Sequence, residues 1–250
     1  MKGFVINLER AVERREAVGK FFDAIPELEF VVVPAVNGKE LALPHPDYSE
    51  KGYRCCHGKR TNRAQVATFF SHLKALRLFL ETSDEHGIIM EDDVQFGPDL
   101  LEVANKAIAA RPDCGMIRLA GHRNGRPVGL AQLDETYQLG IDTTRQTGTG
   151  CYLVDRETAQ HLLDKLPPMT LPIDHAFDRE WRWSGLTMRV FPFPANQRAN
   201  TTASQNNALE PEKLSPWIRY WTVFPFRAVN ETKRYLYRKG QIARAKRSSA

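Results

Sequence analysis

Three consecutive carboxylates, Glu91-Asp92-Asp93, follow the apolar run Ile88-Ile89-Met90. Adjacent carboxylates repel one another, and burial beside a hydrophobic strand raises their pKa values unless a cation compensates. Mg²⁺ and Mn²⁺ prefer hard oxygen ligands of this kind. Ligands of open α/β sheets also bind beyond the carboxyl ends of the strands. The triplet therefore indicates a divalent-metal site, with a solvated turn before the next helix as the alternative.

A second group of residues is suited to binding an anion. Asn7, Arg10, Arg14 and Arg15 lie at the end of the first apolar segment and in the first turns of the helix expected to follow it. Helix amides and guanidinium groups together bind phosphate. Combined with the acidic triplet, these residues predict a pocket for a nucleotide diphosphate. The alternative is a surface helix with ordinary ion pairs between residues four apart.

A third group is Asp174 and Asp178, which follow Pro172. Their spacing places both on one helix face, which is unfavourable for like charges unless a cation or a catalytic function lies there. Asp174 suits either a helix N-cap or a catalytic carboxylate directed at the acidic triplet. His72 is interpreted as a core histidine, with a contact to a substrate as the alternative.

The elements that must position these residues alternate along the chain. Apolar and β-branched runs predict strands at residues 2–8, 30–33, 88–90, 114–119, 151–154 and 186–191. Helical spacing predicts helices at residues 10–25, 62–83, 98–110, 156–166 and 174–184. Residues 37–60 are expected to form a loop, and residues 121–148 a hairpin. This order is typical of an α/β/α sandwich with a mixed, mostly parallel sheet.

Composition narrows the class of protein further. The chain has 250 residues, of which 42% are hydrophobic and 26% charged, which excludes intrinsic disorder, collagen and a coiled-coil rod. No apolar run reaches the length of a membrane span, and Glu9 interrupts the apolar start before a signal sequence could form. Four cysteines, with Cys55 and Cys56 adjacent, do not suit a disulfide scaffold. We therefore expect a soluble, cytoplasmic chain with reduced thiols.

The charge is divided between two parts of the chain. Residues 213–250 hold ten basic residues and one acid, for a charge of +9, whereas residues 1–212 carry 25 basic and 29 acidic residues, for a charge of −4. We therefore expect a domain over 1–212 and a basic, aromatic extension over 213–250.

The extension begins with an aromatic helix face. Trp217, Tyr220, Trp221 and Phe224 share one side of a short helix that Pro225 is expected to end. Aromatic and basic residues in one segment are typical of a helix lying in a membrane surface, here the inner face of the cytoplasmic membrane. The alternative is that the aromatic residues brace the domain.

Five motifs in register resemble glycosyltransferase family 25, the group of bacterial lipooligosaccharide galactosyltransferases. The resemblance covers about residues 3–200. The motifs are FVINLxRxxxRR from Phe4 to Arg15, Ala35-Val36-Asn37-Gly38-Lys39, Ser71-His72-Leu73-Lys74, Ile88 to Val94, and Gly148 to Leu153 followed by Leu171-Pro172-Ile173-Asp174.

The resemblance implies a GT-A fold, a UDP-sugar donor with galactose favoured, a divalent cation, inversion at the anomeric carbon, and a lipooligosaccharide or other glycan or glycolipid acceptor. Asp93 would hold Mn²⁺ (or Mg²⁺) in the role of the DxD motif. Uracil, ribose and diphosphate would be bound by Ile6, Asn7, Leu8, Arg10, Arg14, Ala35, Asn37, Gly38, Glu91 and Asp92. The catalytic base would be Asp174, with Asp178 in reserve.

Two other functions are alternatives. A metal-dependent nucleotidyltransferase would employ the same carboxylates and arginines on a nucleoside triphosphate. A nucleic-acid-binding protein would use the basic extension, but the body of the chain is acidic, so we expect no nucleic-acid partner.

Overall fold

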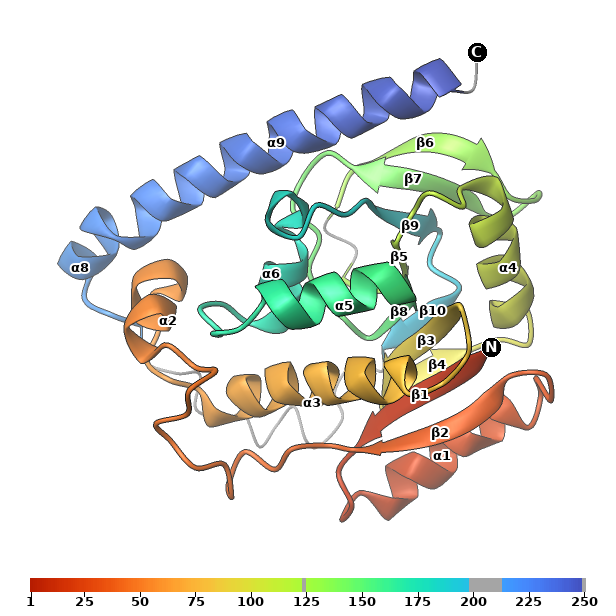
Figure 1. Cartoon of the computed structure of the whole chain (residues 1–250), viewed down its shortest axis with the longest axis horizontal. Coiled ribbons are helices and arrows are strands. Elements are labelled where there is room, and N and C mark those ends of the chain that lie inside the picture. Colours follow the sequence, from red (N-terminus) through yellow and green to blue (C-terminus); the bar gives the residue numbers. More distant parts are fainter. Residues whose placement is uncertain (123–124, 198–212, 249–250) are drawn as a thin grey trace.

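The chain forms a single eight-stranded sheet with helices on both faces (Figure 1). The computed structural model describes residues 1–122, 125–197 and 213–248. The order of the strands across the sheet is β2-β1-β3-β8-β5-β9-β7-β6. They are β1 (Lys2–Asn7), β2 (Glu29–Pro34), β3 (His86–Glu91), β5 (Met116–Ala120), β6 (Pro127–Gln132), β7 (Gln138–Asp142), β8 (Cys151–Asp155) and β9 (Thr187–Phe191).

The sheet is mixed, as predicted, but it is less parallel than expected. Within the eight-stranded sheet of the described residues, three strand pairings are parallel and four are antiparallel. The expected hairpin, β6 and β7, is antiparallel by its short connection. Strand β8 begins beside the end of β3, where Cys151 pairs with Met90, and so runs against it. This reversal brings the segment before β8 next to the acidic triplet.

The side chains of the central strands alternate between two hydrophobic cores, one on each face of the sheet. Val5, Ile88 and Met90 pack on the side of helices α1 (Val12–Phe22) and α4 (Leu100–Ala110). Phe4, Ile6, Ile89 and Tyr152 pack on the side of helices α3 (Arg63–Leu80) and α5 (Arg156–Lys165). Because successive side chains of a strand point to opposite faces, these buried runs require a layer of helices on each side. The predicted α/β/α sandwich is confirmed.

The helix that the apolar stripe predicted, α3, begins at an asparagine N-cap. The side chain of Asn62 accepts hydrogen bonds from the backbone N–H groups of Ala64 and Gln65. Ten of its residues are buried, from Val66 to Phe79. This helix therefore lies fixed across the sheet, with its N-terminal turn at the edge where the strands β1 and β3 end (Figure 1).

Three regions of the chain differ from the predictions. Residues 50–57, expected as loop, form helix α2 (Glu50–His57), which the side chain of Ser49 caps by accepting from the N–H of Gly52. Strands β4 (Val94–Phe96) and β10 (Ala195–Gln197) form a separate two-stranded sheet. The helix expected over 174–184 is divided into α6 (Ile173–Phe177) and the 3₁₀ turn η1 (Glu180–Arg182), because Asp178 between them is drawn into buried ion pairs.

The C-terminal part of the chain is also more helical than predicted. Helix α8 (Pro216–Trp221) is followed by α9 (Val223–Ser248), which crosses the molecule above α6 and β7 (Figure 1). Pro225 does not end the helix, since it occupies the first turn of α9, where a missing N–H costs no hydrogen bond. Within the described residues, no helix combines the length and the apolar character needed to cross a membrane.

Candidate active site

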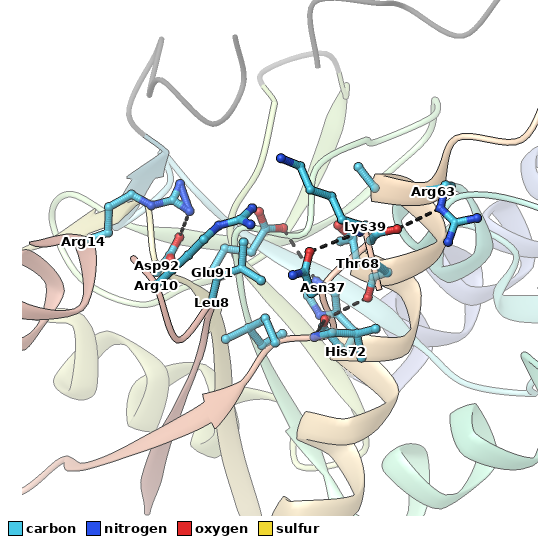
Figure 2. A pocket seen from close by; sticks show the side chains of 17 residues that line it. Leu8, Arg10, Arg14, Asn37, Lys39, Arg63, Thr68, His72, Glu91 and Asp92 are labelled. Carbon is cyan, nitrogen blue, oxygen red and sulfur yellow. Dashed lines mark hydrogen bonds and ion pairs between the residues drawn. The ribbon is translucent and has the colours of Figure 1, made fainter. Parts of the chain in front are cut away.

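A cavity of about 370 Å³ opens where the strands β1 and β3 end (Figure 2). Its walls come from the end of β1, the turn after β2, the first half of α3 and the end of β3. Nine of the ten residues predicted to bind the donor line it: Ile6, Leu8, Arg10, Arg14, Ala35, Asn37, Gly38, Glu91 and Asp92. The tenth, Asn7, is buried beneath the lining, where its side chain donates to Asp92.

Asp92 connects the first and third strands at the floor of this cavity. Its Oδ1 lies 2.5 Å from Nη2 of Arg14, and its Oδ2 accepts a hydrogen bond of 2.7 Å from Nδ2 of Asn7. Burial raises the pKa of Asp92, and these two partners oppose the rise. The pairing holds the Arg14 guanidinium at the cavity, so Asp92 orients a cation there.

The turn after β2 is fastened to helix α3. The backbone N–H of Val36 donates to Oγ of Ser71 at 2.9 Å, and Nε of Arg63 donates to the carbonyl of Gly38 at 2.9 Å. A Cβ at Gly38 would lie 2.9 Å from the carbonyl oxygen of Arg63, so this close approach needs glycine. Lys39 and Arg63 thereby reach the cavity opposite Arg10 and Arg14 (Figure 2).

Arg63 and Lys39 are cavity residues that the sequence analysis missed. Lys39 stands directly after the predicted Gly38, and Arg63 directly follows the helix N-cap Asn62. Both positions carry a signal, because the first turn of a helix and the turn facing it border the same strand ends. Thr68, Ser71 and His72 of α3 complete this wall.

Glu91 is held by two neighbours at the opposite wall. Its Oε1 accepts from Oγ1 of Thr149 at 3.1 Å and lies 3.6 Å from Nε2 of His72. Burial raises the pKa of Glu91, but the contacts to His72 and Thr149 outweigh it and hold that pKa below its ordinary value. His72 is fully buried against Tyr152, as predicted for a core histidine, and also borders the cavity.

Asp174 is aligned by backbone groups. The N–H of Gly148 donates to its Oδ2 at 3.4 Å, and the N–H of His175 donates to its Oδ1 at 2.9 Å. Gly148 has a φ of +90°, a conformation that favours glycine. Burial raises the pKa of Asp174, but His175, these N–H groups and Arg118 together lower it by more than burial raises it. The pKa therefore lies below its ordinary value, and the carboxylate is ionised at neutral pH. Its side chain does not cap α6, whose N-cap is Pro172.

The segment before β8 joins the two carboxylates. Gly148 donates to Asp174, Thr149 donates to Glu91, and the carbonyl of Gly150 accepts from the N–H of Glu91. The negative charge of Asp174 is near enough to Glu91 to oppose the lowering of its pKa. This segment thus links Asp174 to Glu91, but Asp174 does not line the cavity, so its role as the base stays a prediction.

Asp178 has a different environment. Its side chain is fully buried, with Oδ2 2.9 Å from Nε of Arg234 and Oδ1 2.5 Å from Nη2 of Arg238, both on α9. Arg118 lies 3.8 Å from the same Oδ1. Asp178 therefore neutralises arginines that attach the C-terminal helix, and it is not among the residues that line the cavity.

The carboxylates near the cavity are too few to bind a divalent cation by themselves, so the phosphates of a substrate would have to supply further ligands. Asp93 lies in the turn after β3, outside the cavity lining, and Asp92 is already engaged by Arg14 and Asn7. In the part of the chain that the structure describes, no three His, Cys, Asp or Glu side chains are arranged to hold a metal ion by themselves. Mg²⁺ and Mn²⁺ often bind through one or two carboxylates and the phosphates of a substrate. Glu91, which lines the cavity, fits that mode, and the predicted role of Asp93 as the metal ligand stays a prediction.

Comparison with known proteins gives a consistent result. The family model of Glycosyltransferase family 25 (LPS biosynthesis protein) matches residues 1–177. A "Glycosyltransferase 25 family member" of Drosophila melanogaster is 32% identical over 102 residues, which are 38% of this chain and 16% of that protein. One of Anopheles gambiae is 26% identical over 185 residues, 68% of this chain and 30% of that protein. The chain therefore spans less than a third of the length of these relatives.

A solved structure is similar at lower identity. It is a glycosyltransferase involved in the glycosylation of the major capsid of PBCV-1, with a TM-score of 0.41 and 12% identity. The match covers 83% of this chain and 98% of that one.

Proposed function

The chain belongs to glycosyltransferase family 25, and on that basis we propose that it transfers a hexose, with galactose favoured, from a UDP-sugar to a glycan or glycolipid acceptor such as lipooligosaccharide. The reaction would invert the configuration at the anomeric carbon. Because the family is one of glycosyltransferases, it argues against a nucleotidyltransferase.

The observation that supports this proposal is the gathering of four cations around one cavity. Arg10 and Arg14 stand on one side, and Lys39 and Arg63 on the other (Figure 2). Guanidinium and ammonium groups bind phosphate through charge-assisted hydrogen bonds. The rest of the lining includes apolar side chains such as Ile6, Leu8 and Ala35, which suit the flat face of a base. Charged and apolar walls together match a nucleoside diphosphate.

The chemical step needs a base on the face of the sugar opposite the diphosphate. A new bond forms between the acceptor oxygen and the anomeric carbon, while the bond from that carbon to the diphosphate oxygen breaks and its electron pair leaves with UDP. The proton of the acceptor hydroxyl passes to a carboxylate. We assign this role to Asp174, because it is ionised, aligned by two N–H groups and close to Glu91.

The same cations stabilise the leaving group. Negative charge grows on the diphosphate as the bond breaks, and cations fixed in place before the reaction stabilise that charge without reorganising. In this chain, Arg10, Lys39 and Arg63 supply this stabilisation. A divalent cation held by Asp93 or Glu91 would supply Lewis-acid neutralisation of the diphosphate.

Substitution of Asp174 tests the assignment. Asp174→Asn keeps the shape of the side chain and removes the base, so we expect kcat to fall by about 10²–10⁴ with UDP affinity unchanged. Asp164→Asn, an exposed carboxylate on α5, is the control and should behave as the unmodified protein. Near-normal turnover in Asp174→Asn would remove Asp174 from the role, and lost UDP binding would make it a donor ligand instead.

We also propose that the C-terminal helices attach the enzyme to the cytoplasmic face of a membrane. Trp217 and Trp221 are 71% and 62% exposed, and Tyr220 and Phe224 are exposed beside them. The exposure of these side chains argues against the alternative that they brace the domain, although α9 itself docks on the domain through Arg234 and Arg238. Exposed aromatic residues beside lysines and arginines are the composition of an interfacial helix.

Vesicle flotation tests this attachment. Trp217→Ser combined with Trp221→Ser should abolish flotation with phosphatidylglycerol vesicles, because the aromatic face is lost while the docked arginines stay in place. Val12→Ser, at an exposed apolar residue of α1, is the control and should float as the unmodified protein. Equal flotation of the double variant would exclude attachment through α8.

A further inference from the structure

A second, smaller hollow of about 30 Å³ lies between helix α9 and the body of the molecule. It shares no lining residue with the 370 Å³ cavity. Arg145 reaches it from the segment before β8, Arg179 from the turn after α6, and Arg227 from α9. His175 of α6 and Cys56 of α2 also line the hollow. Three guanidinium groups from three distant segments therefore converge on one point.

These arginines have no counterion within the described part of the chain. The acid that lines the hollow, Glu231, is paired with Arg234. Arg145 donates to Nε2 of His175 at 2.9 Å rather than to a carboxylate. Of the described residues, none offers a carboxylate within ion-pair distance of Arg145, Arg179 or Arg227. The hollow therefore carries more positive than negative charge, and among the described residues these three arginines have no carboxylate at ion-pair distance.

Burial makes this excess costly. Nε of Arg179 is buried and has no hydrogen-bond partner among the described residues, and its guanidinium lies 5.2 Å from the centre of the Phe226 ring. Burial, and then the charge of Arg182, lower the pKa of Arg179 to about 10. Burial, and then Arg145 and Arg219, lower the pKa of Arg227. Arginine stays protonated at such values, so the repulsion remains until an anion enters.

We propose that Arg145, Arg179 and Arg227 form a binding site for a phosphate group, and that the acceptor substrate carries this group. Planar guanidinium groups donate paired hydrogen bonds that match phosphate oxygens. The assignment of the phosphate to the acceptor rests on the proposed glycosyl transfer, whereas the phosphate site does not.

The position of the hollow supports the assignment of the phosphate to the acceptor. Nε2 of His175 lies 2.9 Å from Nη2 of Arg145 and 3.9 Å from Oδ2 of Asp174, the proposed base. A phosphate on the arginines would therefore hold the rest of its molecule beside the group that accepts the proton. Such positioning raises the effective concentration of the attacking hydroxyl.

Titration with inorganic phosphate tests the site itself. At constant ionic strength, we expect saturable binding by calorimetry, weakened about 10- to 100-fold in Arg179→Gln and in Arg227→Gln. Lys233→Gln, an exposed base on α9, is the control and should bind phosphate normally. UDP affinity should be unchanged in all three variants. No saturable binding, or normal binding by both arginine variants, would overturn the site.

Competition then identifies the carrier of the phosphate. If the acceptor carries it, glucose 6-phosphate should displace inorganic phosphate, while glucose and dihexanoyl phosphatidylglycerol should not. Displacement by the lipid alone would overturn the acceptor assignment in favour of a membrane headgroup. A chain that binds phosphate at these arginines but transfers no sugar would refute the proposed function and leave the phosphate site standing.

Discussion

Asp178 is predicted to be a structural residue whose loss destabilises the fold without removing the catalytic base. It is fully buried and surrounded by Arg118, Arg234 and Arg238. Asp178→Asn keeps the volume of the side chain but leaves these arginines with one acid fewer. Glu180, also paired with Arg238, retains part of the compensation.

The size of the effect follows from the buried ion pairs. Removing one partner of a buried pair costs about 3–5 kcal/mol, because the remaining charge is left uncompensated. For a chain of this size, each kcal/mol lowers the melting temperature by about 2–4 °C. We therefore expect Asp178→Asn to melt about 6–20 °C below the unmodified protein.

Thermal unfolding followed by circular dichroism measures this change, with Asp164→Asn as the exposed control. Adding Arg234→Met to Asp178→Asn should cost less than the sum of the two single substitutions, since the second removes a charge that the first left without its buried partner. A folded Asp178→Asn with an unchanged melting temperature and a hundredfold lower kcat would refute the reasoning and make Asp178 the base.

Two further predictions concern backbone conformation and pH. Gly148→Ala should lower kcat without weakening UDP binding, because a Cβ would lie 2.9 Å from the backbone nitrogen of His122 and displace the N–H that holds Asp174; Gly240→Ala, whose Cβ meets nothing within 4 Å, should have full activity. Burial lowers the pKa of His57 from 6.5 to about 3, so as pH falls the unfolded chain takes up the proton first and stability is lost from pH 6.5 downwards. Urea unfolding at pH 7 and pH 5 should therefore show a loss of about 2 kcal/mol that is absent from His57→Gln, and an equal loss in both proteins would contradict this.

Most residues that line the large cavity could be predicted from the sequence, because their positions depend on local rules. The apolar runs before Asn7 and Glu91 are buried strands, and the residues after parallel strands meet at one edge of a sheet. The motif around Gly38 follows the neighbouring strand β2 and reaches the same edge. For Arg63 the local signal was only its place in the first turn of α3, and its contact with the cavity is made by packing α3 across the sheet.

The C-terminal helix could not be predicted, because its buried face is polar. After Val223 at its start, the buried positions of α9 in the described residues are Asn230, Arg234, Arg238 and Ala245, and the two arginines pair with Asp178 and Glu180. Sequence patterns reveal helices through apolar stripes, and here ion pairs replace the stripe.

Helix α2 was missed for a related reason. Tyr53 and His57 are its two buried side chains, and Gly52 weakens its helix propensity. The one local signal was Ser49, which caps the helix and precedes an acid, Glu50, in its first turn.

The most direct test of the donor site is calorimetric titration of UDP-galactose in the presence of Mn²⁺. Thr68 lies in the cavity wall, so Thr68→Trp should fill the cavity and abolish binding without removing a charge. Thr136→Trp, at an exposed turn, should bind as the unmodified protein. If Thr68→Trp retains full affinity, or if the unmodified chain binds no UDP-sugar, the cavity between β1 and α3 is not the donor site.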